Sequence, residues 1–321
     1  MKRRTCIAAI AALPLATALP ALSAEPVWPT RPVRLLVGFP GGSSPDLTAR
    51  TLAEPLSKAL GQPVIVENKP GASGNIATAQ VAKATDDHTL GLVINGNLTS
   101  SALLNPKLPY NPARDFTYIS LLTQAPLILV AAADAPAGRA FFDAARAAGD
   151  RWNYGSVGVG SVAHLGMELL NSRAGISPVH VPYPGTPQIV TAILGGQVQM
   201  GLIAPGVALP QVKAGKLRAV GVTSGRSTLA PEVPSLVEAG VRDFNLEVWN
   251  ALVGPAGMSP AARARLGAEV GKIVRSEPVR QKLFAQGWQA VGSSEEGLKR
   301  RIREETAMLR DIISTRGIKL D

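Results

Sequence analysis

The sequence predicts an α/β protein of two domains, and three observations support this prediction. Strand-like apolar segments alternate with helix-like segments along most of the chain. Two longer apolar strands, near Thr123 and near Trp249, separate a central block from two flanking blocks. The length of 321 residues, 46% of them hydrophobic, suffices for two packed cores. We therefore expect an inserted domain with two hinge crossings: residues 25–123 and 249–321 form domain 1, and residues 124–248 form domain 2.

The first 24 residues have the pattern of a cleaved secretory signal. Three basic residues, Lys2 to Arg4, precede an apolar run that ends in the small residues "ALSA". The alternative is a membrane anchor, but the apolar run is short and is broken by Pro14 and Pro20. Residues 1–24 are therefore predicted to be a signal peptide, and the mature chain is predicted to be exported.

The composition of the remaining chain excludes several classes of protein. The single cysteine, Cys6, lies in the predicted signal, so the mature chain has neither a disulfide nor a thiol nucleophile. Removing the signal leaves 30 basic and 23 acidic residues, a net charge of +7 that is dispersed along the chain. Nucleic-acid binding would need a basic stripe, which the sequence lacks. The most apolar later segment, Val190 to Pro210, is interrupted by glycine and glutamine residues, so we do not expect it to span a membrane.

The first block, from "VRLLVGF" to "HTLGLVIN", has the pattern of three strands that alternate with two helices, βαβαβ. The strand "VRLLVGF" precedes a helix from Pro45 to Leu60, which has Gly61 just beyond its end and Pro55 as an expected bend. The strand "PVIVENK" then precedes a helix from Gly74 to Ala84, and "HTLGLVIN" is a third strand. This rhythm predicts a mostly parallel sheet with helices on both faces.

The second block begins with a long apolar strand, "ISLLTQAPLILVAAADAP". The strands "WNYGSVG" and "SPVHVPY" each precede a helix, the first from Ser161 and the second from Thr186. The segments "QMGLIA" and "LRAVGVTS" are further strands. "NLEVWNALVGPAG" is a crossing back to the first block, and two or three helices finish the chain.

Three strand-to-helix turns share a feature that suits an anionic ligand. We expect Ser44, Ser161 and Thr186 to cap their helices, with Pro45 and Pro187 as first helical residues. Each turn leaves backbone N–H groups and the positive end of a helix dipole facing outward. Carboxylates and phosphates bind at such ends, and ligands of open α/β sheets bind beyond the carboxyl ends of the strands.

Two features near these turns allow more than one interpretation. Phe39, Tyr154, Tyr183 and Trp249 lie beside the turns and the return crossing, and they either wall a cleft or belong to the core. Asp46 stands in the first turn of its helix. Its carboxylate either stabilises the helix start or accepts a hydrogen bond from an amine or hydroxyl of a ligand.

Enzymatic patterns are weak in this sequence. "GVGSVA" fits a loose dinucleotide fingerprint, but the following strand ends without an acidic residue to hold a ribose. Neither Ser156 nor Ser161 satisfies G-x-S-x-G, the pattern of a serine hydrolase. We also expect that the residues of the turns form no nucleophile–base pair. The three histidines have no paired spacing, and His164 is expected to bond a neighbouring carbonyl. No catalytic residue, metal site or cofactor is therefore predicted.

Taken together, nine motifs in order resemble the Bug family, the extracytoplasmic solute receptors of tripartite tricarboxylate transporters. They run from about Trp28 to the C-terminus: "RPVRLLVGFPGGSSPDLTAR", "LGQPVIVENKPGASGNIATAQVAKA", "LPYNPARDF", "YGSVGVGSVAHLGMELL", "HVPYPGTP", "ILGGQVQMG", "AGKLRAVGVTS", "PEVPSLVEAG" and "PAGMSP".

The resemblance implies a type II periplasmic-binding-protein-like fold, in which two α/β domains joined by a two-crossing hinge close on a small carboxylate. It implies ligand-binding residues in four parts of the chain: Phe39, Pro40, Gly41, Gly42, Ser43, Ser44 and Asp46; Asn95 and Thr99; Ser156, Gly158, Gly160, Ser161 and His164; and Tyr183, Thr186, Pro187 and Ala204. Ser43 and Pro45 depart from the usual residues of the first turn, and Pro184 replaces a usual Lys.

The resemblance also implies a monomeric periplasmic receptor with no enzymatic activity. Its partners would be a small carboxylate and the membrane subunits of a tripartite tricarboxylate-type transporter, and not nucleic acid. Two alternatives remain at this stage: a sensor protein that uses the same cleft without a transporter, and an exported enzyme of unknown class.

Overall fold

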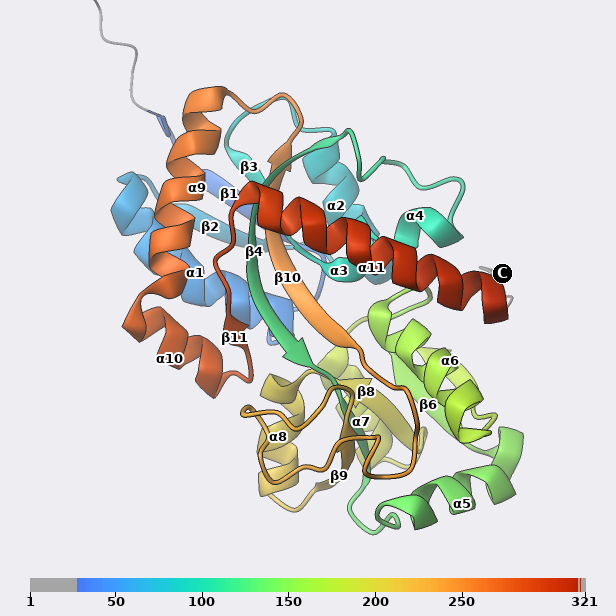
Figure 1. Ribbon diagram of the computed structural model, residues 1–321. Helices are drawn as coiled ribbons and strands as arrows, with labels where there is room; N and C mark the ends of the chain where they lie inside the picture. Colours follow the sequence, from blue (N-terminus) through green and yellow to red (C-terminus); the bar gives the residue numbers. More distant parts are fainter. Residues whose placement is uncertain (1–27, 317, 319–321) are drawn as a thin grey trace, which may run out of the picture.

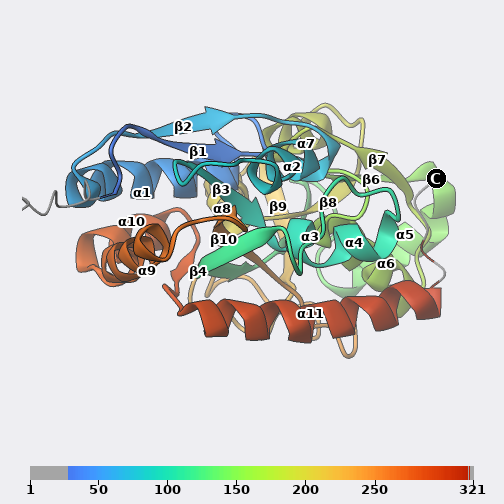
Figure 2. The same cartoon turned by 90° about the horizontal axis from the view of Figure 1, so that it is seen from above.

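The computed structural model describes residues 28–316 and residue 318. The predicted signal peptide, residues 1–24, lies outside the described residues. The described chain forms two β-sheets, each covered by helices on both faces (Figures 1 and 2). The predicted two-domain α/β architecture is thereby confirmed.

The first sheet has six strands in the order β11-β4-β10-β3-β1-β2. Their bounds are β1 Val33–Val37, β2 Val64–Asn68, β3 Thr89–Ile94, β4 Phe116–Pro126, β10 Glu247–Pro255 and β11 Gln289–Ala290. β1 pairs in parallel with β2 and β3, whereas β10 runs antiparallel to both β3 and β4. The sheet is therefore mixed and not mostly parallel, because the chain returns from the second sheet through β10 between β3 and β4.

Alternation of apolar side chains in β1 explains why helices cover both faces of this sheet. Leu35 and Val37 pack toward α1, α9 and α10, while Leu36 packs toward α2 and α11. The helices and short helical segments of this part are α1 Ser44–Leu60, η1 Ala72–Gly74, α2 Asn75–Ala82, α3 Asn95–Leu98, α4 Ser100–Leu104, α9 Pro260–Arg275, α10 Glu277–Ala285 and α11 Glu295–Arg316.

α1 differs from its prediction at the start and in the middle. It begins at Ser44 with Ser43 as the N-cap, one residue earlier than predicted. Pro55 was expected to bend this helix, but the helix continues through Pro55 without interruption. Gly61 closes the helix in the left-handed conformation, as predicted from its position.

The second sheet has five strands in the order β7-β6-β8-β5-β9. Their bounds are β5 Ile128–Ala132, β6 Asn153–Ser156, β7 Val179–Pro182, β8 Met200–Ile203 and β9 Leu217–Val222. The accompanying helical segments are α5 Arg139–Ala148, η2 Gly149–Arg151, α6 Val162–Ala174, α7 Thr186–Leu194 and α8 Pro205–Lys213. Alternate residues of β5 divide between the faces: Leu129 packs with α5 and α6, and Ile128 packs with α7 and α8.

The chain crosses between the sheets twice, and one side chain, that of Thr223, forms hydrogen bonds to both crossings. The first crossing is Leu127, between β4 and β5; the second is Leu246, just before β10. Thr223 joins them: its hydroxyl receives the Leu127 N–H at 2.8 Å and donates to the Leu246 carbonyl at 2.6 Å. The single long strand expected from Ile119 to Pro136 is thus two strands that belong to different sheets.

The last helix, α11, lies along both parts of the molecule. It packs against β4 of the first sheet and extends to α6 beside the second sheet (Figures 1 and 2). Leu309 of α11 is buried in one apolar cluster with Leu165 of α6 and Leu104 of α4. The C-terminal helix therefore contacts both domains in this conformation.

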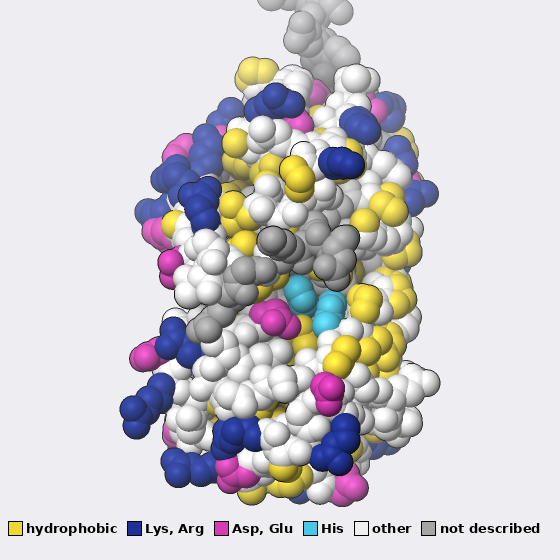
Figure 3. All heavy atoms as spheres, turned by 90° about the vertical axis from the view of Figure 1, so that its right-hand side faces the viewer, with side chains coloured by type: hydrophobic (Ala, Val, Ile, Leu, Met, Phe, Trp, Pro, Cys, Tyr) yellow, Lys and Arg dark blue, Asp and Glu magenta, His cyan; other side chains and the backbone are white. Residues whose placement is uncertain are grey.

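Charged side chains are spread over the surface. On the face shown in Figure 3, Lys and Arg side chains alternate with Asp and Glu side chains instead of forming one patch. Within the described residues, no helix has the length and apolar character needed to cross a membrane. The same residues contain no group of three or more His, Cys, Asp or Glu side chains that could hold a metal ion.

Candidate functional site

A small cavity of about 50 Å³ lies between the two sheets, where the two domains meet. Both domains and both crossings supply its walls. Its lining residues are Phe39, Ser43, Ser44, Pro45, Ile94, Asn95, Leu127, Val157, Ser161, Val162, Ala163, Thr186, Leu202, Ala204, Val248, Asn250 and Trp288. Seven of the residues predicted from the sequence are among them: Phe39, Ser43, Ser44, Asn95, Ser161, Thr186 and Ala204.

The starts of four helices of eight residues or more converge on this cavity. Ser44 begins α1, Val162 begins α6, Thr186 begins α7, and Ala204 is the N-cap of α8. The first N–H groups of a helix have no partner within the helix, and the dipoles place positive potential at these ends. Among the described residues that line the cavity there is no Lys, Arg, Asp or Glu. The positive potential in the cavity therefore comes from backbone.

The first turn differs from its prediction in a way that favours ligand binding. Ser44 does not cap α1: its hydroxyl has no hydrogen-bond partner in the described chain although the residue is 4% exposed. Ser43 is the N-cap residue, and its hydroxyl donates to the Pro40 carbonyl at 2.6 Å. Because Ser44 lines the cavity, its hydroxyl is available to a bound molecule.

The other two helix starts follow the prediction more closely. The Ser161 hydroxyl caps α6 by accepting the His164 N–H at 3.2 Å. Thr186 is the first residue of α7 and not its cap, because Gly185 occupies the N-cap position. Pro187 is consequently the second residue of this helix, and it does not line the cavity.

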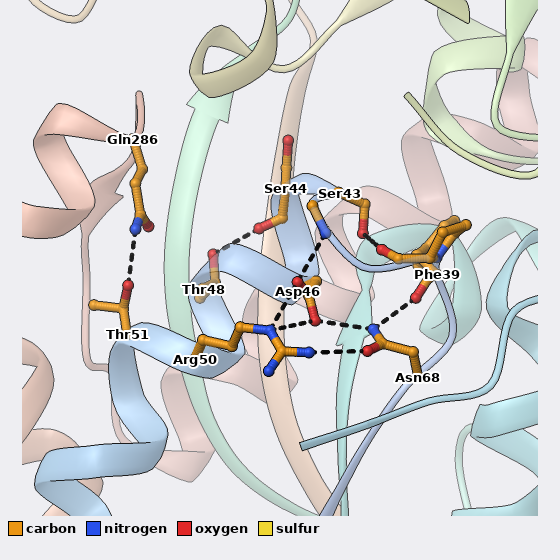
Figure 4. Close-up of polar contacts among 11 residues, drawn as sticks. Phe39, Ser43, Ser44, Asp46, Thr48, Arg50, Thr51, Asn68 and Gln286 are labelled. Carbon is orange, nitrogen blue, oxygen red and sulfur yellow. Dashed lines mark hydrogen bonds and ion pairs between the residues drawn. The ribbon is translucent and has the colours of Figure 1, made fainter. Parts of the chain in front are cut away.

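Asp46 faces away from the cavity. Its carboxylate accepts hydrogen bonds from the Gly42 N–H at 2.9 Å, from Arg50 Nε at 3.0 Å and from Asn68 Nδ2 at 2.9 Å (Figure 4). Burial alone would raise the pKa of Asp46, but these hydrogen bonds together hold it below its ordinary value. Of the two interpretations, this geometry favours the one in which Asp46 stabilises the helix start.

Figure 4 also shows how hydrogen bonds connect the first turn to β2. The Nδ2 of Asn68, at the end of β2, donates to the Phe39 carbonyl as well as to Asp46, and the Oδ1 of Asn68 accepts from Arg50 Nη2 at 3.1 Å. The turn before α1 is therefore tied to the neighbouring strand on the side opposite the cavity.

Ser156 and His164 are both buried, and neither lines the cavity. His164 Nδ1 accepts the Gly160 N–H at 3.2 Å, so this ring bonds an N–H and not the carbonyl that was expected. Burial lowers the pKa of His164 to about 4, which keeps the ring neutral at neutral pH. The ring lies 4.3 Å from that of His180, centroid to centroid.

A serine–histidine contact is present that the sequence reasoning did not foresee. Ser156 Oγ lies 2.7 Å from His180 Nε2, and His180 belongs to strand β7, outside the three turns. Ser156 is fully buried, and its hydroxyl also receives the Gly158 N–H at 3.2 Å. It does not line the cavity, and the contact therefore holds the β6 turn in place.

The remaining predicted residues lie around the cavity without lining it. Gly158, Gly160 and Tyr183 line a second, more open pocket of about 370 Å³ between the domains. Pro40, Gly41 and Gly42 form the turn before α1. Thr99 donates to the Asn95 carbonyl at 2.8 Å and so supports a lining residue from behind.

The two domains touch directly at the rim of these pockets. Ser73 of the first domain donates to the Val159 carbonyl at 3.1 Å, and Ser100 donates to the Gly160 carbonyl at 2.5 Å. At another point Gly206 packs against the Gln286 carbonyl so closely that an added Cβ would lie 1.8 Å from it. The two domains are therefore in direct contact on the sides of these pockets.

Sequence reasoning missed two polar residues of the cavity, Asn250 and Trp288. Asn250 follows Trp249 in β10, and Trp288 stands between α10 and β11. Both are buried, and both have an unpartnered polar atom, Oδ1 of Asn250 and Nε1 of Trp288. A polar residue inside the apolar return strand "EVWNALVGP" was the available signal for Asn250, whereas nothing near Trp288 marked it.

A cavity between two α/β domains, lined by helix starts and, among the described residues, by no charged side chain, is typical of a protein that binds a small solute. Comparison with known proteins identifies the family. Residues 48–318 match the model of the TctC family, described as "Tripartite tricarboxylate transporter family receptor". The chain belongs to this family of receptors, as its nine motifs predicted.

Solved structures agree with this assignment. The periplasmic binding protein BugD is 26% identical, with a TM-score of 0.86 over 91% of this chain and 99% of BugD. MatC (Rpa3494) from Rhodopseudomonas palustris with bound malate is 32% identical, with a TM-score of 0.84 over 89% of this chain and 100% of that one. Rpa4515 of R. palustris with adipate is 29% identical, with a TM-score of 0.87 over 91% of this chain and 99% of that one. These similarities confirm the predicted fold class.

Proposed function

We propose that this protein is a periplasmic receptor that captures a small carboxylate between its two domains and delivers it to a tripartite tricarboxylate-type transporter. The observation that carries the proposal is the convergence of four helix starts on one interdomain cavity. Backbone N–H groups in this arrangement are suited to a carboxylate. Two relatives whose structures contain malate and adipate give the chemical class further support.

Side-chain donors supplement the backbone. The Ser44 hydroxyl and the Trp288 indole N–H are buried at the cavity and have no partner in the described chain. A buried donor without a partner costs free energy, and a ligand carboxylate would remove that cost. The carboxylate would thus be bound by neutral donors from α1 and from the turn before β11.

The hinge and domain boundaries form part of the proposal. We place the boundaries at the crossings Leu127 and Leu246, within a few residues of the positions 123 and 249 expected from the sequence. The domains would open about these crossings to admit ligand and close on it. The predicted signal peptide would direct the chain to the periplasm, where the mature protein would act as a monomer.

A thermal-shift screen followed by calorimetry tests the proposed function. Mature protein, from residue 25 onward, would be screened against mono-, di- and tricarboxylates and acidic amino acids. Ligand at a hundredfold above its dissociation constant should stabilise the protein by about 2.7 kcal/mol. No stabilisation by any of these acids at millimolar concentration would contradict carboxylate capture. Transport would be tested separately, by deleting the gene and measuring uptake of the acid that binds.

A further inference from the structure

The cavity contains two hydrogen-bond acceptors that a plain carboxylate cannot satisfy. Asn95 and Asn250 both line it, and neither is exposed to solvent. In each residue the side-chain oxygen Oδ1 is buried without a hydrogen-bond partner. An ionised carboxylate only accepts hydrogen bonds, so it offers these oxygens nothing.

Neighbouring groups fix the orientation of the Asn95 amide. Its Nδ2 donates to Glu305 Oε1 at 2.8 Å and to the Glu247 carbonyl at 3.2 Å. Turning the amide over would place Oδ1 against the Glu247 carbonyl, which can only accept a hydrogen bond, and this is unfavourable. The nitrogen therefore stays with Glu305 and Glu247, and the oxygen remains for the cavity.

The Asn250 amide is fixed in the same way. Its Nδ2 donates to Thr123 Oγ1 at 3.1 Å and to Thr48 Oγ1 at 3.3 Å. The Thr48 hydroxyl gives its own hydrogen to the Ser44 carbonyl at 3.1 Å, so toward Asn250 it can only accept. The Asn250 Nδ2 therefore bonds to the protein, and Oδ1 remains available to a ligand in the cavity.

The two oxygens belong to one small region of the site. Ile94 and Asn250 are register partners on the adjacent strands β3 and β10, and Asn95 follows Ile94 directly. The donors of the site lie apart from them in the chain, at the helix starts and at Trp288. The cavity thus combines a donor-rich part for a carboxylate with an acceptor pair of fixed orientation.

We propose that this cavity selects carboxylic acids that also carry a hydrogen-bond donor, a hydroxyl or an amine, which Asn95 Oδ1 and Asn250 Oδ1 receive. This inference rests on the proposed function and specifies its substrate class. Glu305 acts as a positioning residue, because it holds the Asn95 amide nitrogen. Plain dicarboxylates of the same length bind more weakly, since they leave both oxygens buried without a partner.

Matched ligand pairs test the inference in the unaltered protein. Calorimetric titration would compare succinate with malate, and glutarate with 2-hydroxyglutarate, since each pair differs by one hydroxyl. We expect the hydroxy acid of a bound pair to have a Kd at least tenfold lower. Equal Kd values within the bound pairs would overturn this inference and leave carboxylate capture standing. Binding of none of the four acids would overturn this inference, whereas the proposed function fails only if no acid of the wider thermal-shift screen binds.

Substitutions of Asn95 and Asn250 then test whether these two residues cause the preference for hydroxy acids. Asn250→Leu and Asn95→Leu each remove one acceptor, and each should reduce the ratio of the two Kd values toward one. Asn75→Leu is the control, because Asn75 Oδ1 already receives the Tyr110 hydroxyl and the Asn97 amide and does not line the cavity. It should leave the ratio unchanged even if it lowers stability. A ratio that persists in both cavity variants would overturn the assignment to these oxygens.

Discussion

The indole N–H of Trp249 donates a hydrogen bond to Glu305 Oε2 across 2.5 Å, joining the return strand β10 to the C-terminal helix α11. Glu305 is buried, and its other oxygen receives Asn95 Nδ2. Arg301 Nε, one helical turn away, lies 3.7 Å from Oε2, and Arg301 itself pairs with Glu247 at 3.1 Å. A carboxylate in the core is thus surrounded by donors and one partly exposed cation.

The buried Glu305 predicts a pH dependence of stability. Burial raises the pKa of Glu305 to about 7, although Trp249, Arg301 and Asn95 oppose this. Between pH 4.5 and 7 the folded state binds more protons at this group than the unfolded state, so its contribution to stability falls as pH rises through this range. Compared with Glu305→Gln, the wild type should lose about 3 kcal/mol of unfolding free energy over this interval.

Urea unfolding of wild type and Glu305→Gln at several pH values measures this difference. The contrast between the two proteins matters, because other groups titrate in both. Parallel stability curves from pH 4.5 to 7 would show that Glu305 has an ordinary pKa.

Ser44 and Ser43 allow a prediction that separates binding from stability. Ser44→Ala removes a buried hydroxyl that has no partner in the described chain, so the melting temperature of the free protein should stay the same or rise. Carboxylate affinity should fall about tenfold, the effect of one lost hydrogen bond of roughly 1.4 kcal/mol. Ser43→Ala loses the bond to the Pro40 carbonyl and should cost about 1 kcal/mol of stability. Calorimetry and thermal melts of both variants check this, and an unaltered affinity in Ser44→Ala would remove Ser44 from the binding site.

Asp46→Asn should act on stability and not on ligand choice. The change removes the charge that Arg50 and the Gly42 N–H stabilise, at a cost of about 1–2 kcal/mol. Because the folded pKa of Asp46 is lowered, its stabilising contribution is present above the ordinary carboxyl pKa and is lost as pH falls through the folded value. The difference in unfolding free energy between the wild type and Asp46→Asn should therefore become smaller at acidic pH. Titration of malate and succinate should give the same ratio of Kd values in both proteins; a changed ratio would place Asp46 in contact with ligand after all.

Gly206 predicts how closure can be blocked. A Cβ at this position would lie 1.8 Å from the backbone carbonyl of Gln286 in the other domain. Gly206→Ala should therefore favour the open form, increase the radius of gyration at saturating ligand and weaken binding. Gly225→Ala in the same domain is the control, because a Cβ there meets nothing within 4 Å. Small-angle scattering with and without ligand measures the effect, and identical radii for both variants would show that the Gly206 contact is not part of closure.

Local sequence patterns predicted the elements and the family but not the chemistry of individual side chains. Glycines, prolines and capping residues mark turns through short-range geometry, so α1 and α6 were located within a residue or two. Whether Ser44 or Ser43 caps α1 depends on a one-residue shift that these patterns do not resolve. The position of β10 between β3 and β4 depends on long-range pairing, and for that reason the mixed sheet was not predicted.

The candidate site was predicted where it depends on turns and missed where it depends on packing between distant segments. Ser161 and Thr186 were found because each stands at a recognisable strand-to-helix turn. Trp288 and Asn250 reach the cavity because α10 and β10 pack beside it. The polar side chain within an apolar strand was the one signal for Asn250, and nothing near Trp288 marked it. Asp46 was ambiguous because its partner Asn68 lies 22 residues away.

The absence of charged side chains from the described cavity wall has a consequence for how such a receptor can diversify. A backbone N–H survives every substitution except proline, so mutations of wall residues such as Val157, Leu202 or Val248 would reshape the space without removing the helix starts that bind the anion. Substitutions that change the size of wall side chains would then change which acid fits the cavity, while the backbone N–H groups would still bind a carboxylate. In this scaffold, changing ligand would not require passing through a form that binds nothing.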